Sequence, residues 1–124
     1  MGTKVDVVVM NHDVEVLEAL ATAVEAAGFT VAKQYARGPV DQLAAFIRQQ
    51  DPKVVVYDFG PPPAELAVEK WRDLCRQPGA SRAYVLTSTF AHELDGDAAI
   101  VECILLKPMT FDEVAAAVRR AMQR

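Results

Sequence analysis

The sequence predicts an α/β fold: a single (βα)5 domain with a doubly wound parallel sheet, covered by helices on both faces. Two observations predict it. Five short apolar runs, rich in Val, Ile and Leu, alternate with segments of helical spacing. Continuous apolar runs are typical of strands buried on both faces, and alternation of strands and helices favours a parallel sheet. A chain of 124 residues without a linker or repeat has the size of one domain, so we expect one that spans residues 1–124.

Turn and cap signals set the expected element boundaries. We expect strands at residues 5–10, 29–35, 54–57, 83–87 and 103–106. We expect helices from about residue 16 to Gly28, at 40–50, at about 64–76 and at about 111–122. The glycine, together with Asp51-Pro52 and Pro78-Gly79, supplies the helix stops.

Two helical segments carry further expectations. The helix at about 64–76 should pack Leu66, Val68, Trp71, and Leu74 or Cys75 against the sheet. Residues 90–101 are ambiguous, because a Gly between two Asp residues interrupts a short or irregular helical pattern.

Composition argues against several classes of protein. The formal net charge of −4 provides no overall basic field, which disfavours nucleic-acid binding. The apolar runs fall well short of the roughly 20 residues that span a bilayer, and no signal peptide is separable from the first strand. We therefore expect a cytoplasmic protein without a membrane partner. Cys75 and Cys103 lie far apart and have no metal-ligand spacing, so we expect small buried hydrophobic residues there.

Asp58 is the most informative residue of the chain. It closes the third apolar run and precedes a turn rich in Gly and Pro. A carboxylate at the carboxyl end of a parallel strand lies at the crevice where open α/β sheets bind ligands. Within this window alone, Asp58 could equally be a residue that opens the turn, as Asp often does.

Polar residues follow the other predicted strands at the same edge of the sheet. Asn11, His12 and Asp13 follow the first strand, Thr87 and Ser88 the fourth, and Lys107 the fifth. A carboxylate can act as a nucleophile, and a hydroxyl and an ammonium group can hold the oxygens of a transferred phosphoryl group. Together these residues predict a phosphoryl-transfer site around Asp58.

At these residues the chain resembles the CheY-like receiver domains of two-component response regulators. The resemblance covers essentially the whole chain. It is carried by Val54–Asp58 with Pro62, then by Val85-Leu86-Thr87-Ser88, and then by Leu106-Lys107-Pro108 before a helix. It implies a flavodoxin/CheY-like fold with strand order 2-1-3-4-5.

The resemblance also implies roles. Asp58 would be the phosphoacceptor and Thr87 the switch hydroxyl, with Ser88 and Lys107 as further contacts of the phosphoryl group. The bond between Lys107 and Pro108 would be a candidate cis peptide. The implied partners are a histidine kinase or phosphotransfer protein and a downstream output domain or protein, and a homodimer stays open. Such a domain is not an enzyme beyond self-catalysed phosphorylation and dephosphorylation of its aspartate.

The end of the first strand departs from the family pattern. Typical receivers carry two adjacent acids there that hold Mg²⁺, whereas this chain has Asn11 and His12. A register shifted by one would instead make His12 and Asp13 the pair. Mg²⁺ prefers oxygen ligands, so we expect its binding to be possible but weakened, with Asp58, Asp13 and the Gly60 backbone as remaining ligands.

Two of these residues have simpler interpretations. Asp13 is expected to be a helix N-cap. His12 is expected to be a solvent-exposed loop residue, and the alternative is a cation beside Asp58.

A second departure lies on the fifth strand. Receivers usually carry Tyr or Phe three residues before the Lys, and here that position is Ile104. The stretch between Thr87 and Lys107 is also slightly short for the family. Coupling between Asp58 and this face of the domain is therefore in doubt.

Three functions remain after these observations. The first is a receiver that accepts a phosphoryl group on Asp58 with impaired Mg²⁺ binding. The second is a pseudo-receiver, which is a phosphorylation-independent protein-interaction module. The third is a small flavodoxin-like enzyme or ligand-binding domain, and the lack of a Gly-rich loop after the first strand argues against it.

Overall fold

The computed structural model describes residues 4–60, 63–89, 101–107 and 109–123. They form a five-stranded parallel sheet with the order β2-β1-β3-β4-β5. The strands are β1 (Val7–Asn11), β2 (Val31–Tyr35), β3 (Val54–Asp58), β4 (Ala83–Ser88) and β5 (Val101–Leu106). The helices within the described residues are α1 (Val14–Ala26), α2 (Val40–Gln50), α3 (Ala64–Arg76) and α4 (Phe111–Met122). The predicted fold class and strand order are confirmed.

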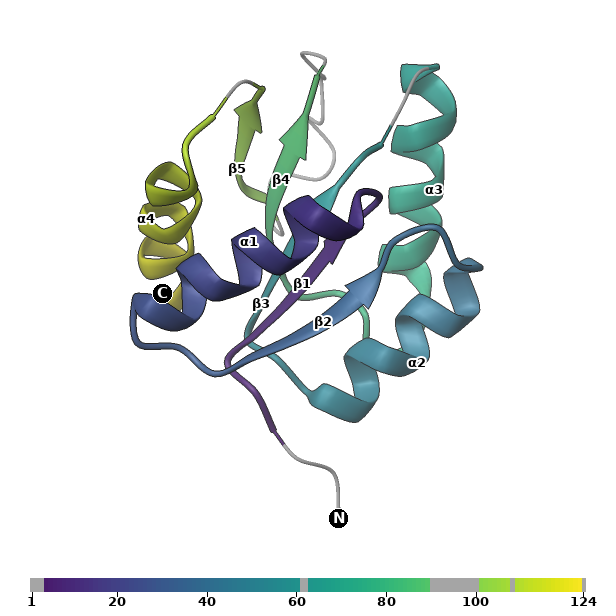
Figure 1. The fold of residues 1–124 in the computed structure, drawn as a ribbon. Helices are drawn as coiled ribbons and strands as arrows, with labels where there is room; N and C mark the ends of the chain where they lie inside the picture. Colours follow the sequence, from purple (N-terminus) through teal and green to yellow (C-terminus); the bar gives the residue numbers. More distant parts are fainter. Residues whose placement is uncertain (1–3, 61–62, 90–100, 108, 124) are drawn as a thin grey trace.

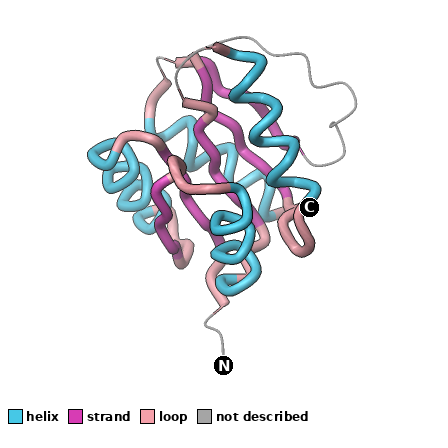
Figure 2. The backbone as a smooth tube through the Cα atoms, turned by 90° about the vertical axis from the view of Figure 1, so that its right-hand side faces the viewer, coloured by secondary structure: helices cyan, strands magenta, loops and turns pink. Residues whose placement is uncertain are grey.

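Helices cover both faces of the sheet (Figures 1 and 2). Alternate residues of the central strands point to opposite faces. Val7, Val9, Val54 and Val56 pack with α1 and α4, whereas Val8, Met10, Val55 and Tyr57 pack with α2 and α3. Both faces of the sheet are therefore buried, which is consistent with the continuously apolar sequences of these strands.

The first two strands begin later than predicted. Val5 is buried but precedes β1, and the pairing of β1 with β2 begins at Val7 and Val31. Between them, Asp6 N donates to Thr30 Oγ1 at 2.9 Å, and Thr30 N donates to Asp6 Oδ2 at 2.9 Å. These side-chain bonds accompany backbone bonds from the N–H groups of Asp6 and Val7 to the carbonyl of Thr30, and the regular ladder starts at Val7 and Val31, two residues later than predicted.

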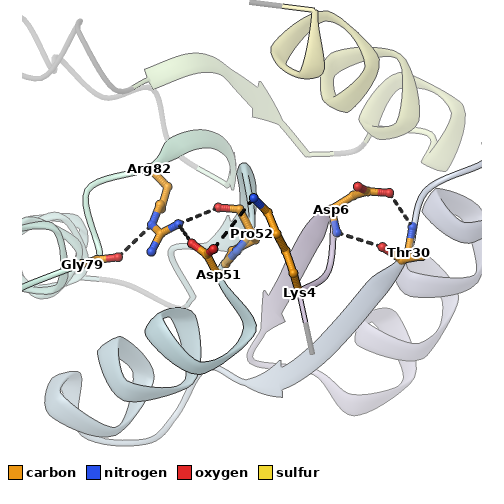
Figure 3. A network of polar contacts seen from close by, with 7 residues as sticks. All are labelled: Lys4, Asp6, Thr30, Asp51, Pro52, Gly79 and Arg82. Carbon is orange, nitrogen blue, oxygen red and sulfur yellow. Dashed lines mark hydrogen bonds and ion pairs between the residues drawn. The ribbon is translucent and has the colours of Figure 1, made fainter. Parts of the chain in front are cut away.

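Figure 3 shows this pair together with a second group of polar contacts at the amino ends of the strands. Arg82 Nη1 lies 2.7 Å from Asp51 Oδ1, and Arg82 also donates to the carbonyls of Pro52 and Gly79. Asp51 has a left-handed φ of 48° and ends α2. These contacts fix the loops at the edge opposite Asp58.

One predicted core position on α3 is wrong. Leu66 is 68% exposed, whereas Ala67, Val68, Trp71 and Leu74 are buried. Three consecutive apolar residues cannot all face the sheet on a helix, and the register of α3 turns Leu66 outward. Cys75 is half-buried against the core, as expected, and the side chain of Cys103 lies outside the described part of the chain.

No helix in the described part of the chain combines the length and the apolar character that a membrane span requires.

Candidate functional site

Asp58 is the last residue of β3 and is only 2% exposed. Parallel pairing of β3 with β4 places it level with Thr87. Thr87 Oγ1 donates to Asp58 Oδ1 at 3.0 Å, and Lys107 Nζ lies 2.7 Å from the same oxygen. The structure therefore brings together a carboxylate, a hydroxyl and an ammonium group that come from three neighbouring strand ends.

The backbone positions Lys107 beside this group. Lys107 follows β5, and its N–H donates to the carbonyl of Ser88 at 2.8 Å, which holds the residue close to the end of β4. The Lys107 side chain is 32% exposed, so its ammonium group reaches Asp58 from the solvent side. Ser88 is fully buried.

His12 is not a solvent-exposed loop residue, so that expectation is wrong. Its side chain is only 14% exposed, and its Nδ1 lies 3.2 Å from Asp58 Oδ2. The connection between β1 and α1 is short and keeps the ring close to the end of β3. The two oxygens of Asp58 thus have different partners, with Thr87 and Lys107 on one and His12 on the other.

The side chains of Asn11 and Asp13 accept backbone N–H groups at the turn between β1 and α1. Met10 pairs with Tyr57, so Asn11 follows at the level of Asp58. Asn11 is 1% exposed, and its Oδ1 accepts the backbone N–H of Asp13 at 2.9 Å. Within the described residues, its Nδ2 has no hydrogen-bond partner.

The predicted N-cap at Asp13 is confirmed. Its Oδ1 accepts the backbone N–H groups of Glu15 at 2.9 Å and Val16 at 3.2 Å. This geometry favours Asn11 and His12, rather than His12 and Asp13, as the counterparts of the acidic pair.

The pocket beside Asp58 has a volume of about 410 Å³. It is lined by Asn11, His12, Asp13, Val16, Arg37, Asp58, Gly60, Thr89 and Lys107. Arg37 and Thr89 were not predicted as site residues. Both follow strands, β2 and β4, and thus lie at the same edge of the sheet as Asp58, which is the sequence signal that could have indicated them.

Several expectations lie outside the described residues. They are the cis peptide at Pro108, the ambiguous segment at 90–100 and the side chain of Ile104.

The environment of Asp58 changes its proton affinity. Burial raises the pKa of the carboxyl group, but hydrogen bonds from His12, Lys107 and Thr87 and the charge of Lys107 outweigh burial, so the pKa lies below its ordinary value. Asp58 is therefore ionised at neutral pH. Its carboxylate is an acceptor only, which suits its three donors.

This lowered pKa predicts a specific loss of stability in acid. A group whose pKa is lower in the folded state stabilises the fold above its unfolded pKa, and the stabilisation disappears as pH falls through the folded value. We expect the wild type to lose more free energy of unfolding between pH 6 and about pH 3 than Asp58→Asn does. Urea unfolding followed by Trp71 fluorescence measures both. Equal losses in the two proteins would contradict the lowered pKa.

Gly60 allows the ring of His12 to lie close to the backbone after β3. Its φ is +82°, and a Cβ built there would lie 2.8 Å from His12 Cε1 and 2.9 Å from both Nδ1 and Nε2. Nearly equal distances to three ring atoms mean that the backbone of Gly60 faces the flat side of the imidazole.

We expect Gly60→Ala to destabilise the protein more than Gly28→Ala. Both glycines have positive φ, which alone costs about 1–2 kcal/mol for a residue with a Cβ. Gly28 has nothing within 4 Å of a built Cβ, whereas Gly60 has the ring of His12. Urea unfolding of the two variants isolates the contact with His12. A smaller loss for Gly60→Ala than for Gly28→Ala would show that the ring does not lie there.

Comparison with known proteins identifies the fold. No family model and no curated protein matches the chain. Among solved structures, a sensor protein from Polaromonas sp. JS666 has a TM-score of 0.75 at 19% identity, with 95% of each chain covered. A CheY-like response regulator receiver domain from Methylobacillus flagellatus has a TM-score of 0.69 at 16% identity, covering 96% of this chain and 99% of the other. A putative pilus assembly-related protein from Burkholderia pseudomallei K96243 has a TM-score of 0.64 at 25% identity, covering 99% and 92%.

The chain has the fold of CheY-like response regulator receiver domains over essentially its whole length. The resemblance seen in the sequence is confirmed at the level of the fold.

Proposed function

We propose that the chain is a receiver-type signalling domain in which Asp58 accepts a phosphoryl group from a histidine kinase or phosphotransfer protein. The observation that carries this proposal is that one oxygen of the buried Asp58 carboxylate contacts both Lys107 Nζ and Thr87 Oγ1. A turn-forming aspartate would need neither contact.

The proposed reaction forms an acyl phosphate. A carboxylate oxygen of Asp58 attacks the phosphorus of the donor, and the bond from phosphorus to the donor's leaving atom breaks with its electron pair. The leaving group, an imidazole nitrogen of a phosphohistidine for example, takes up a proton from water. Lys107 neutralises charge on the transferred oxygens, and Thr87 can turn its hydroxyl from the carboxylate to one of them. The domain is then a phosphoacceptor, with at most self-catalysed phosphorylation and dephosphorylation, and not an enzyme with a separate substrate.

The residues beside Asp58 do not fit the Mg²⁺ that the fold family implies. Asn11 and His12 stand where two carboxylates would be needed, and the one oxygen of Asn11 already accepts the N–H of Asp13. No cluster of three or more potential metal-ligating side chains occurs within the residues that the structure describes. Asp58, Asp13 and the backbone of Gly60 remain as ligands, so we propose that any Mg²⁺ binding is weak.

A second function is favoured by the contact of His12 with Asp58. Because that contact occupies the remaining oxygen of the carboxylate, the domain could use the receiver fold as a pseudo-receiver, an interaction module that needs no phosphorylation. In either case the proposed partner is a protein, an output domain or target or a second copy of this chain, and neither nucleic acid nor membrane.

Intact mass measurement distinguishes the two functions. The protein is incubated with Mg²⁺ and a small phosphodonor such as acetyl phosphate, and then weighed. We expect the wild type to gain the mass of one phosphoryl group and Asp58→Asn to gain none. If the wild type gains none while a control receiver does, the phosphoacceptor proposal is wrong and the pseudo-receiver is favoured.

A further inference from the structure

We infer that the imidazole of His12 occupies the place beside Asp58 that a divalent cation would need, so that the resting site is complete without metal. This inference concerns the site of the proposed function and relies on that proposal only to identify it. The ring contacts two groups, the carboxylate of Asp58 through Nδ1 and, with its flat side, the face of Gly60 where a Cβ would project. A cation bound to Asp58 Oδ2 on the side of His12 would have to displace the ring.

Four of the side-chain oxygens at this site already contact donors. Asn11 Oδ1 accepts the N–H of Asp13, and Asp13 Oδ1 accepts two N–H groups of α1. Asp58 Oδ1 accepts from Thr87 and contacts Lys107, and Asp58 Oδ2 contacts His12. A hard cation such as Mg²⁺ needs about six oxygen ligands in near-octahedral geometry. A metal bound through these four oxygens would therefore compete with the hydrogen bonds that hold the start of α1 and with the contact of His12.

Charge leads to the same conclusion. Asp58 is balanced by Lys107 at 2.7 Å, and Arg37 lines the same pocket. Asn11 at the end of β1 and His12 after it contribute an amide and an imidazole and no negative charge, whereas Asp13 also lines the pocket. The two cationic side chains of the pocket offset its two carboxylates, so the site lacks the excess negative charge that favours a divalent cation.

The same geometry assigns the proton on His12. The carboxylate of Asp58 can only accept hydrogen bonds, so Nδ1 must carry the hydrogen that lies between the two residues. His12 is thus a positioning residue that holds Oδ2 of Asp58, as Lys107 and Thr87 hold Oδ1.

Manganese titration tests the metal-free site. Mn²⁺ binding, read from the loss of the electron paramagnetic resonance signal of the free ion, is compared between the wild type and the double variant Asn11→Asp/His12→Asp. We expect the double variant to bind Mn²⁺ at least about tenfold more tightly. Adding Asp58→Asn to the double variant should abolish the gain. Wild-type binding as tight as that of the double variant would overturn the inference.

Nuclear magnetic resonance of the wild type tests the position of His12, with Asp58→Ala as the control variant. Long-range proton–nitrogen spectra, recorded where the imidazole is neutral, report which ring nitrogen carries the hydrogen. We expect a protonated Nδ1 for His12, and loss of that preference in Asp58→Ala. A bare Nδ1 in the wild type would overturn the inference. Neither experiment contains a phosphodonor, so both outcomes are independent of whether Asp58 is phosphorylated.

Discussion

Trp71→Ala is expected to lower the free energy of unfolding by about 3–5 kcal/mol. Trp71 is fully buried on α3, and its ring makes edge-to-face contacts with Phe59 at 6.0 Å and with Tyr84 at 5.6 Å between centroids. Its removal would leave a cavity between α3 and the sheet, next to Phe59, the residue that follows Asp58. Urea unfolding followed by circular dichroism measures the loss, because the variant has no tryptophan.

Leu66→Ala is the matched control for this prediction. Leu66 lies on the same helix but is 68% exposed, so its truncation should change the free energy of unfolding by no more than about 0.5 kcal/mol. Similar losses for the two variants would mean that α3 does not pack on the sheet in the register described.

Lys107→Met is expected to have the largest effect at the site itself. It removes the cation that lies 2.7 Å from a carboxylate that is 2% exposed. Burial raises the pKa of Asp58 and Lys107 lowers it, so without Lys107 that pKa should rise. Since the Lys107 side chain is 32% exposed, we expect the free energy of unfolding at neutral pH to fall by roughly 1–3 kcal/mol, less than for a fully buried pair. Phosphoryl incorporation should also be lost, because the transferred oxygens lose their counter-charge.

A double-mutant cycle isolates this contact. In the Asp58→Asn background the buried charge is absent, so Lys107→Met should cost clearly less than in the wild type. Urea unfolding of the wild type, the two single variants and the double variant gives the coupling energy. Equal costs of Lys107→Met in the two backgrounds would contradict the ion pair.

The fold could be predicted from the sequence because its signals are local and agree with one another. Apolar runs such as Val54-Val55-Val56 are typical of strands in a parallel sheet covered on both faces, and Asp51-Pro52 and Gly28 lie close to the positions where the structure ends the helices. The prediction that Leu66 is buried was wrong because two apolar residues follow it, and sequence spacing alone does not say which of the three faces outward.

Part of the site could be predicted from the sequence and the position of His12 could not, for a physical reason. The convergence of Asp58, Thr87 and Lys107 follows from strand order, which places the ends of β3, β4 and β5 side by side. The place of His12 depends on the absence of a Cβ at Gly60, which lets backbone and ring approach, and no local pattern reports such a contact between two loops. The convergence of Asp58 and Lys107 could therefore be predicted from the sequence, whereas His12 was expected in solvent and lies beside Asp58.

The most direct test of the central claim is a time course of phosphoryl incorporation on Asp58, with Mg²⁺ and with a chelator in its place. The central claim is our proposal that Asp58 accepts the phosphoryl group and that His12 takes the place of a metal beside it. The expected result is incorporation that is lost in Asp58→Asn and that proceeds at a similar rate with and without Mg²⁺. Incorporation that requires Mg²⁺, or no incorporation under either condition, would contradict it.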